Sequence, residues 1–210
     1  MKKLLGFSIF LVFVLIASLT AEAKVTLPAI FSDNMVLQQN TQVNVWGKAA
    51  PGEKVTVKAS WLDKAVTAKA AANGKWTVKL KTPKAITNQS VTVSGENEIT
   101  INNVLIGEVW LCTGQSNMEF PVSRHPDVKW NTGMLNEVEE LKDADYPEIR
   151  LFHVKHQLAH EGELDDCEGE WLVCNPKNLY DFSAVGFVFG RKLYKELKMP
   201  VGLIQSLSLI

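Results

Sequence analysis

The chain has 210 residues, of which 46% are hydrophobic and 21% are charged, and its formal net charge is −1 at pH 7. This composition is typical of a globular protein with room for one or two domains. A net charge so close to zero provides no strong electrostatic field to attract nucleic acid or an anionic membrane surface, so we expect no nucleic-acid partner.

Residues 1–23 have the pattern of an export signal. Lys2 and Lys3 precede an apolar stretch over residues 4–17, which is too short for a comfortable membrane span. Residues 21–23 then read Ala-Glu-Ala, a small-residue cleavage site. We therefore expect a mature chain that starts at Lys24, is exported to the periplasm or the extracellular space, and does not stay in the membrane after cleavage. An uncleaved anchor is the alternative.

The chain contains three cysteines, so at least one of them is unpaired. Cys167 and Cys174 are close enough in sequence to form a disulfide in an oxidising compartment, and three free thiols are the alternative. Cys112 lies in an apolar run, where cysteine usually behaves as a small buried hydrophobic residue. No group of Cys and His has the spacing of zinc ligands, so we expect neither a metal nor another cofactor.

Residues 24–103 alternate between apolar and polar positions with a period of two, which is typical of half-buried strands. Turn residues separate these runs, at Pro51-Gly52-Glu53 and at Asn73-Gly74. Short strands at this spacing predict an all-β sandwich, jelly-roll-like, over this range. The predicted strands include residues 43–46, 55–57, 76–80, 91–93 and 99–101.

The outward positions of this predicted sandwich are rich in lysine. Lysines on solvated strand faces mostly serve solubility and protect sheet edges, and a glycan-binding face is the alternative. Tryptophans at alternate positions are more often core residues, although their rings also stack on sugars. The lysines are Lys48, Lys54, Lys58, Lys64, Lys69, Lys75, Lys79, Lys81 and Lys84, and the tryptophans are Trp46, Trp61 and Trp76.

The pattern changes at Val104, where strands and helices begin to alternate as in a parallel α/β sheet. Buried strands are predicted at residues 104–112, 149–154 and 201–204, and a long polar loop over 156–176. Helices are predicted over residues 131–143 and 183–197, the second with Ser183 as its N-cap. Their predicted apolar faces contain Leu135, Val138 and Leu141 in the first helix, and Val185, Val188, Phe189 and Leu193 in the second.

A serine follows the first of these strands, in the sequence Gly114-Gln115-Ser116-Asn117. Open α/β sheets place their chemistry beyond the carboxyl ends of the strands. Gly114 lacks a Cβ, so the chain can turn there and present the Ser116 hydroxyl. The side-chain amides of Gln115 and Asn117 and the Ser116 backbone N–H would lie near a developing oxyanion. Met118 departs from the common G-x-S-x-G nucleophile pattern, so an ordinary polar loop is the alternative.

Four segments, in order along the chain, resemble the sialate O-acetylesterase family, which belongs to the SGNH group of serine hydrolases. The resemblance implies a flavodoxin-like α/β domain over residues 104–210 and a carbohydrate esterase that needs no cofactor. It also implies that Ser116 is the nucleophile that removes O-acetyl groups from sugars through an acyl-enzyme. Acetylated xylan or another glycan rivals sialic acid as substrate. The four segments are residues 31–39 (FSDNMVLQQ), 110–118 (WLCTGQSNM), 183–187 (SAVGF) and 200–204 (PVGLI).

Some of the family's catalytic groups have no counterpart in this sequence. The family's general base is a histidine in an Asp-x-x-His block, and no aspartate here has a histidine three residues later. Its remaining oxyanion donors, a glycine after the third strand and a later asparagine, cannot be assigned either, because the chain ends at Ile210. We therefore expect a truncated hydrolase domain, inactive by itself, whose strand at 201–204 lies at the sheet edge.

Two alternatives stay open. His125 with Asp127 could form a local catalytic group with Ser116, since such sites are recognised by geometry and not by order in the sequence. The chain could also be a non-catalytic fragment that acts at most as a carbohydrate-binding module. The general base and the oligomeric state are unknown at this stage.

Overall fold

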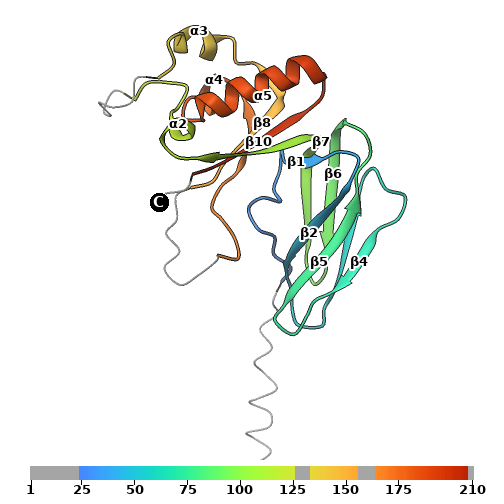
Figure 1. The fold of residues 1–210 in the computed structure, drawn as a ribbon. Helices are drawn as coiled ribbons and strands as arrows, with labels where there is room; N and C mark the ends of the chain where they lie inside the picture. The colour runs from blue at the N-terminus through green and yellow to red at the C-terminus, as the bar shows by residue number, and fades with distance from the viewer. Residues whose placement is uncertain (1–23, 126–132, 156–163, 208–210) are drawn as a thin grey trace, which may run out of the picture.

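The computed structural model describes residues 24–125, 133–155 and 164–207. The molecule is elongated, with strands along its length and the helices gathered at one end (Figure 1). The predicted signal segment 1–23 lies outside the described residues. Among the described helices, none has the length and apolar character needed to cross a membrane.

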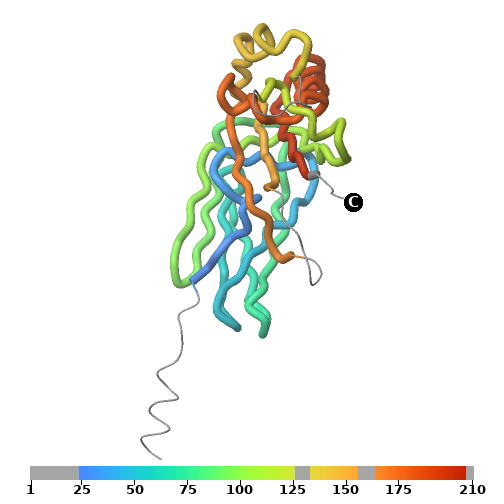
Figure 2. The backbone as a smooth tube through the Cα atoms, turned by 90° about the vertical axis from the view of Figure 1, so that its left-hand side faces the viewer, coloured from blue at the N-terminus to red at the C-terminus, as the bar shows by residue number. Residues whose placement is uncertain are grey.

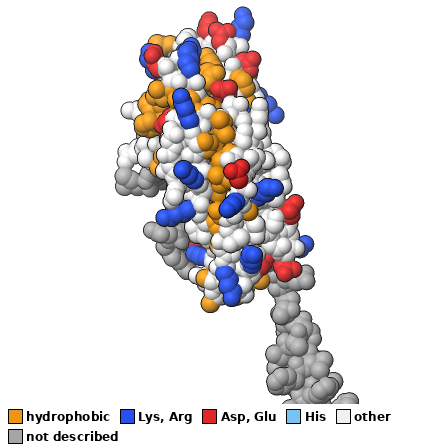
Figure 3. All heavy atoms as spheres, turned by 90° about the vertical axis from the view of Figure 1, so that its right-hand side faces the viewer, with side chains coloured by type: hydrophobic (Ala, Val, Ile, Leu, Met, Phe, Trp, Pro, Cys, Tyr) orange, Lys and Arg blue, Asp and Glu red, His pale blue; other side chains and the backbone are white. Residues whose placement is uncertain are grey.

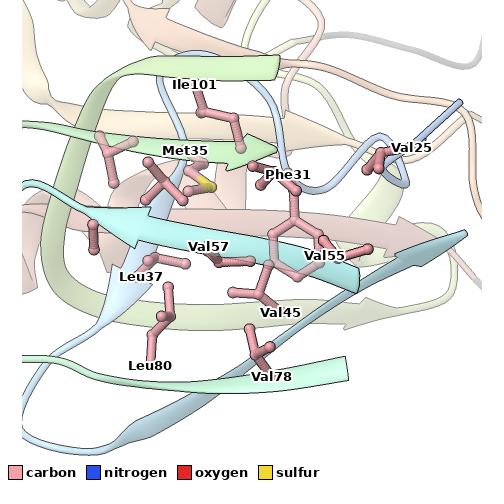
Figure 4. Close-up of a cluster of buried hydrophobic side chains, with 14 of the residues drawn as sticks. Val25, Phe31, Met35, Leu37, Val45, Val55, Val57, Val78, Leu80 and Ile101 are labelled. Atoms are coloured by element: carbon pink, nitrogen blue, oxygen red, sulfur yellow. The ribbon is translucent and has the colours of Figure 1, made fainter. Parts of the chain in front are cut away.

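The N-terminal part consists of strands in two layers. A two-stranded antiparallel sheet packs on a larger sheet, and the apolar side chains of both layers meet in one core (Figure 4). In the strand Lys75–Lys81, for example, Trp76, Val78 and Leu80 are buried while the residues between them are exposed. The smaller sheet contains β2 (Gln42–Lys48) and β5 (Lys75–Lys81); the larger one contains β3 (Lys54–Ala59), β4 (Val66–Lys69), β6 (Ile86–Ser94) and β7 (Glu98–Gly114).

The lysines expected on the outside of these strands are all exposed. Figure 3 shows lysine and arginine side chains spread over the lower half of one face, beside a band of hydrophobic side chains. Of the three tryptophans expected in the core, only Trp76 is fully buried, with 3% of its surface exposed. Trp46 is 41% exposed, and one side of its ring makes an edge-on contact with the buried ring of Phe31.

The long strand β7 connects the two parts of the molecule. Its first half pairs antiparallel with β6, and β1 (Val36–Gln38) pairs parallel with its middle. Its last part, Glu108–Gly114, pairs parallel with β10 (Val201–Leu207). The domain boundary predicted between residues 103 and 104 therefore falls inside a continuous strand, and the division into two domains stays a prediction.

The sheet continues beyond β7 in the order β10, β8 (Tyr146–His153) and β9 (Trp171–Cys174). Strand β10 is parallel to both β7 and β8 and lies between them, so the prediction that it forms the sheet edge is wrong. The prediction of a loop throughout 156–176 is wrong as well, since β9 pairs antiparallel with β8. Four residues are too few to show strand periodicity, but Trp171 buries its ring and donates from Nε1 to the Ile30 carbonyl at 2.8 Å.

Helix α5 (Ala184–Leu197) begins as expected, because the Ser183 hydroxyl accepts the Gly186 N–H at 3.1 Å. Its buried face differs from the prediction. Phe187 and the glycines on either side of it face the sheet, and a Cβ on Gly190 would overlap Leu203 of β10. The close approach that glycine allows brings this face against the strands, so Val185, Val188 and Phe189 are left exposed.

The helix predicted over 131–143 is shorter in the structure, where α3 spans Glu137–Lys142. Residues 131 and 132 lie outside the described part of the chain. The predicted apolar face is mostly not buried: Leu135 is fully exposed and Val138 is 69% exposed. An ion pair between Glu140 and Arg191 holds α3 on α5 instead. Two single-turn helices complete the fold, α2 (Ser116–Glu119) and α4 (Pro176–Leu179).

The N-terminal segment before β2 ties the two parts together, and in Figure 2 it runs beside the segment that carries β9. Asn34, at a φ of 69°, accepts a hydrogen bond of 3.0 Å from the guanidinium of Arg150 on β8. Arg150 is 4% exposed, and this burial lowers its pKa while Glu148 acts in the opposite direction. Gln38 accepts the Val109 N–H at 2.9 Å. These contacts cross the predicted domain boundary.

All three cysteines are free, so the alternative of three thiols holds and the Cys167–Cys174 disulfide does not form in this structure. Cys112 and Cys174 are buried, as expected for Cys112. Burial raises the pKa of both thiols, that of Cys174 to about 12. The buried run predicted from Val104 to Cys112 is only partly buried, because Trp110 and Leu111 are 42% and 62% exposed.

Candidate active site

Three parallel strands, β7, β10 and β8, end at the same edge of the sheet. Gly114 at the end of β7 pairs with Leu207, and Gln205 of β10 pairs with both Cys112 and His153. The loop after β7 and the end of β8 therefore lie at one edge, two strands apart. This is the edge where open α/β sheets bind their ligands.

Ser116 is the first residue of α2 and follows β7 by two positions. The residue is exposed, as are its neighbours Gln115 and Asn117. The Gln115 carbonyl accepts the N–H groups of Met118 and Glu119 at 2.8 and 3.1 Å, which fixes the turn. The first N–H groups of a helix have no acceptor within it, so the backbone at Ser116 presents donors toward solvent.

The loop is held from the side of α5. The Phe120 carbonyl accepts the Ala184 N–H at 2.8 Å, and the Ser183 hydroxyl lies 3.2 Å from the sulfur of Met118. The Ser183 N–H in turn donates to the side chain of Gln205 on β10 at 2.9 Å. Gln205 is 1% exposed. A buried side chain of the central strand thus fixes the segment that supports the Ser116 loop.

Gly114 has a φ of 158°, a backbone conformation that residues with a side chain rarely adopt, so glycine is suited to the end of β7. Its role in presenting the Ser116 hydroxyl stays a prediction. A Cβ there would lie 3.3 Å from the Cβ of Met118, which is tighter than an ordinary contact. The missing side chain therefore leaves room for Met118 beside Gly114.

Of the four histidines, the structure describes His125 and His153, and neither is hydrogen-bonded to Ser116. Nε2 of His125 lies 2.7 Å from Oδ1 of Asp181, and its ring packs edge-on against Tyr180. Asp127, the partner expected for His125, lies outside the described residues, as do His156 and His160. Within the described part of the chain, no hydrogen bond joins a histidine to the Ser116 hydroxyl. His125 is thus paired with Asp181 in the described residues, and the local group of Ser116, His125 and Asp127 stays an untested alternative.

A cavity of about 710 Å³ opens over β8, β9 and α4. Sequence reasoning singled out none of its charged residues and treated His153 as an unassigned histidine. For Asp181 the sequence did hold an indication, because this residue lies two positions before the segment at Ser183 that resembles the esterase family. The polar residues that line the cavity are His153, Lys155, Glu170, Lys177, Asn178 and Asp181, and its apolar lining residues are Leu151, Leu172 and Phe182.

The described ranges contain no group of three or more His, Cys, Asp or Glu side chains that could hold a metal ion. The chemistry that these residues offer is that of a hydroxyl, amide groups, imidazoles and paired charges. An exposed serine between amide side chains at the edge of a parallel sheet is suited to acyl transfer once a base is supplied.

No protein-family model matches the chain. The sialate O-acetylesterase of Mus musculus is 32% identical over 198 residues, which cover 85% of this chain and 35% of the mouse protein. The human sialate O-acetylesterase is 30% identical over 194 residues, covering 83% and 35%. The chain spans about a third of the length of these curated relatives. A carbohydrate acetylesterase from Xanthomonas citri matches its fold with a TM-score of 0.77 at 30% identity, covering 87% of this chain and 40% of that one.

Proposed function

We propose, on the premise that this chain is a relative of the sialate O-acetylesterase family, that it carries the nucleophile of a serine esterase acting on O-acetylated carbohydrates. In this proposal residues 24–103 form a jelly-roll-like sandwich. Residues 104–210 form the first part of an SGNH-type hydrolase domain. This proposal is supported by the sequence identity to the sialate O-acetylesterases and by the fold similarity to the Xanthomonas citri enzyme. The exposed serine at the sheet edge provides a group that can carry out the reaction.

The position of Ser116 carries the proposal. Its hydroxyl is exposed at the carboxyl edge of three parallel strands, in a loop fixed by α5 and Gln205. The Ser116 oxygen would attack the acetyl carbonyl carbon and release the sugar hydroxyl, and water would then hydrolyse the acetyl-serine to acetate. The Ser116 N–H and the amides of Gln115 and Asn117 would stabilise the negative charge on the carbonyl oxygen.

The proton of the Ser116 hydroxyl needs an acceptor, because a neutral serine is a weak nucleophile near pH 7. No described histidine is bonded to that hydroxyl, and His125 is bonded to Asp181 instead. We therefore propose that the 210-residue chain by itself turns over slowly. The general base stays unassigned in this proposal.

The substrate proposed first is an O-acetylated sialic acid, with acetylated xylan or another acetylated glycan as the alternative. The nearby cavity contains charged groups of both signs, among them Lys177 and Asp181, so its lining does not favour an acidic over a neutral sugar. We propose no nucleic-acid partner and no cofactor. We further propose export to the periplasm or the extracellular space, tested by whether the mature chain isolated from cells starts at Lys24.

Acetate release tests the function. The purified chain is incubated with O-acetylated sialic acid, with acetylated xylan and with p-nitrophenyl acetate, and Ser116→Ala is compared with the unchanged chain. Ser60→Ala is the matched control, because Ser60 is an exposed serine on the N-terminal layer, far from Ser116 in the fold, whose hydroxyl donates to the Gln89 side chain and accepts the Ser90 N–H. We expect a slow release that Ser116→Ala abolishes and Ser60→Ala leaves unchanged. Equal rates for Ser116→Ala and the unchanged chain on all three substrates would contradict the proposal.

A further inference from the structure

A second cavity, of about 320 Å³, lies between the smaller sheet and the segment that follows residue 163. None of its lining residues belongs to β8, β9, β10 or the helices, so it is separate from the edge that carries Ser116. Its walls come from three places that are distant in the sequence. These are Thr26, Leu27 and Pro28; Trp46–Lys48 of β2 with Lys75–Thr77 of β5; and Asp165 with Asp166.

The apolar lining of this cavity consists of Leu27, Pro28 and the indole rings of Trp46 and Trp76. Trp46 is 41% exposed and is steadied by an edge-on contact with Phe31, whose ring centroid lies 4.6 Å away. Trp76 is buried, with 3% of its surface exposed, and its Nε1 has no hydrogen-bond partner among the described residues. A half-exposed indole held in a fixed orientation offers a flat apolar surface with little entropy to lose on binding.

The polar part of the cavity is held in place before any ligand enters. The two carboxylate oxygens of Asp165 lie 3.0 Å from Nζ of Lys48 and 2.5 Å from Nζ of Lys75. These lysines lower the pKa of Asp165, so its carboxylate is charged at neutral pH. Asp166 accepts the Ala29 N–H at 3.0 Å. The carboxylates therefore keep a fixed position and retain further lone pairs that can accept hydroxyl groups.

The charges of the cavity balance, because two lysines face two aspartates. A balanced lining does not favour a phosphate, a nucleic acid or a metal ion. It suits a neutral polyhydroxylated ligand that gives and accepts many hydrogen bonds and places its C–H face on an aromatic ring. The volume is at the low end of the range for small-molecule sites, about 300–1,000 Å³, and so fits a mono- or disaccharide unit.

We infer that this cavity is a carbohydrate-binding subsite, separate from the serine, which holds a sugar unit against Trp46 and between Lys48, Lys75 and Asp165. Bound in this way, a glycan chain would be retained by the protein independently of any reaction at Ser116.

Binding measurements on the full chain with Ser116→Ala in every variant test this subsite. The serine is removed so that a failure of the esterase proposal cannot affect the result. The probes are xylohexaose and 3′-sialyllactose, titrated while tryptophan fluorescence is followed. We expect saturable binding of at least one probe, weakened at least tenfold by Trp46→Ala and less than threefold by Trp46→Phe.

The controls are matched in exposure and in strand. Trp110 is 42% exposed on β7 and does not line the cavity, so Trp110→Ala leaves the affinity unchanged. Lys79 is exposed on the same strand as Lys75, so Lys75→Met weakens binding and Lys79→Met does not. Urea unfolding of each variant separates lost binding from lost folding.

Two outcomes would overturn the inference. One is the absence of saturable binding of both probes to the folded chain. The other is binding that Trp110→Ala weakens as much as Trp46→Ala does. A third result would also contradict the subsite: Lys75→Met lowers the urea midpoint but leaves the affinity intact. In that case the ion pairs of Asp165 serve only to hold its segment on β2 and β5.

Discussion

Nε2 of His125 lies 2.7 Å from Oδ1 of Asp181, across 56 positions of the sequence. The contact forms because the segment after Phe120 runs beside the one before α5: the N–H of Val122 donates to the Phe182 carbonyl at 3.0 Å. An imidazole held in this way is oriented by a carboxylate. His125 thus has the carboxylate partner that orients a catalytic histidine, but it has no hydrogen bond to the Ser116 hydroxyl.

We predict that His125→Ala changes the rate of p-nitrophenyl acetate hydrolysis by this chain by less than about threefold. A general base contributes roughly a hundredfold or more to such a reaction, and His125 makes no described hydrogen bond to Ser116. Initial rates at pH 7.5 for His125→Ala, Ser116→Ala and the unchanged chain provide the measurement. A hundredfold loss in His125→Ala would show that the loop rearranges to bring this imidazole to the serine.

Only the part of the candidate site formed by residues close together in the sequence could be predicted. Ser116 and its neighbours lie within a few residues of each other, directly after an apolar strand, and the structure places them together at the strand's end. Asp181 and His153 reach the same edge through strand order and helix packing. Those contacts span tens of residues, and no local periodicity records them.

Asn34→Gly tests the contact that holds the N-terminal segment on β8. Glycine keeps the backbone at a φ of 69° but removes the oxygen that accepts from the buried Arg150. A lost hydrogen bond to a buried charged group costs about 2 kcal/mol of unfolding free energy. Asn40→Gly is the control, because Asn40 has a φ of 52° and is exposed; we expect it to change stability by less than about 0.5 kcal/mol. Equal urea midpoints for the two variants would contradict this role of Asn34.

Beyond the N-terminal strands, the sequence pattern predicts individual elements but not how they pair and pack. The strand predicted at 201–204 is present as part of β10 (Val201–Leu207). Its place between β7 and β8 follows from pairing partners that its own residues do not reveal. In α5, the hydrophobic residues Val188 and Phe189 suggested the buried face. The helix instead packs through Gly186 and Gly190, because close contact with the sheet requires the smallest side chains.

Gly107→Ala tests how tightly β7 meets the start of β10. A Cβ on Gly107 would lie 2.0 Å from the carbonyl oxygen of Pro200, which is backbone and cannot rotate away. We expect a loss of at least about 2 kcal/mol of unfolding free energy, since one strand must shift. At Gly52 a Cβ would find its nearest neighbour at 3.6 Å, so Gly52→Ala introduces only the strain of its positive φ, about 1 kcal/mol. A smaller loss for Gly107→Ala than for Gly52→Ala would contradict this close approach.

Thiol labelling tests both the cysteine states and the burial of the strands. The thiolate is the reactive form, and the pKa of Cys174 is raised to about 12 by burial, so this thiol stays protonated as the pH rises from 7 to 9. We expect the folded chain to react slowly with Ellman's reagent at Cys167 alone, which is half-buried, with a rate that increases over this range. Cys167→Ser should remove that phase.

In urea all three thiols of the unchanged chain become accessible, and we expect three equivalents of reagent to react without prior reduction. A Cys167–Cys174 disulfide would leave only Cys112 to react. The count in urea therefore distinguishes this disulfide from three free thiols, the two states left open by the sequence. Rapid labelling of Cys174 in the folded chain at pH 8 would instead mean that β9 separates from β8 in solution. The Cys174 thiol has to become exposed before it can ionise near the ordinary pKa of cysteine.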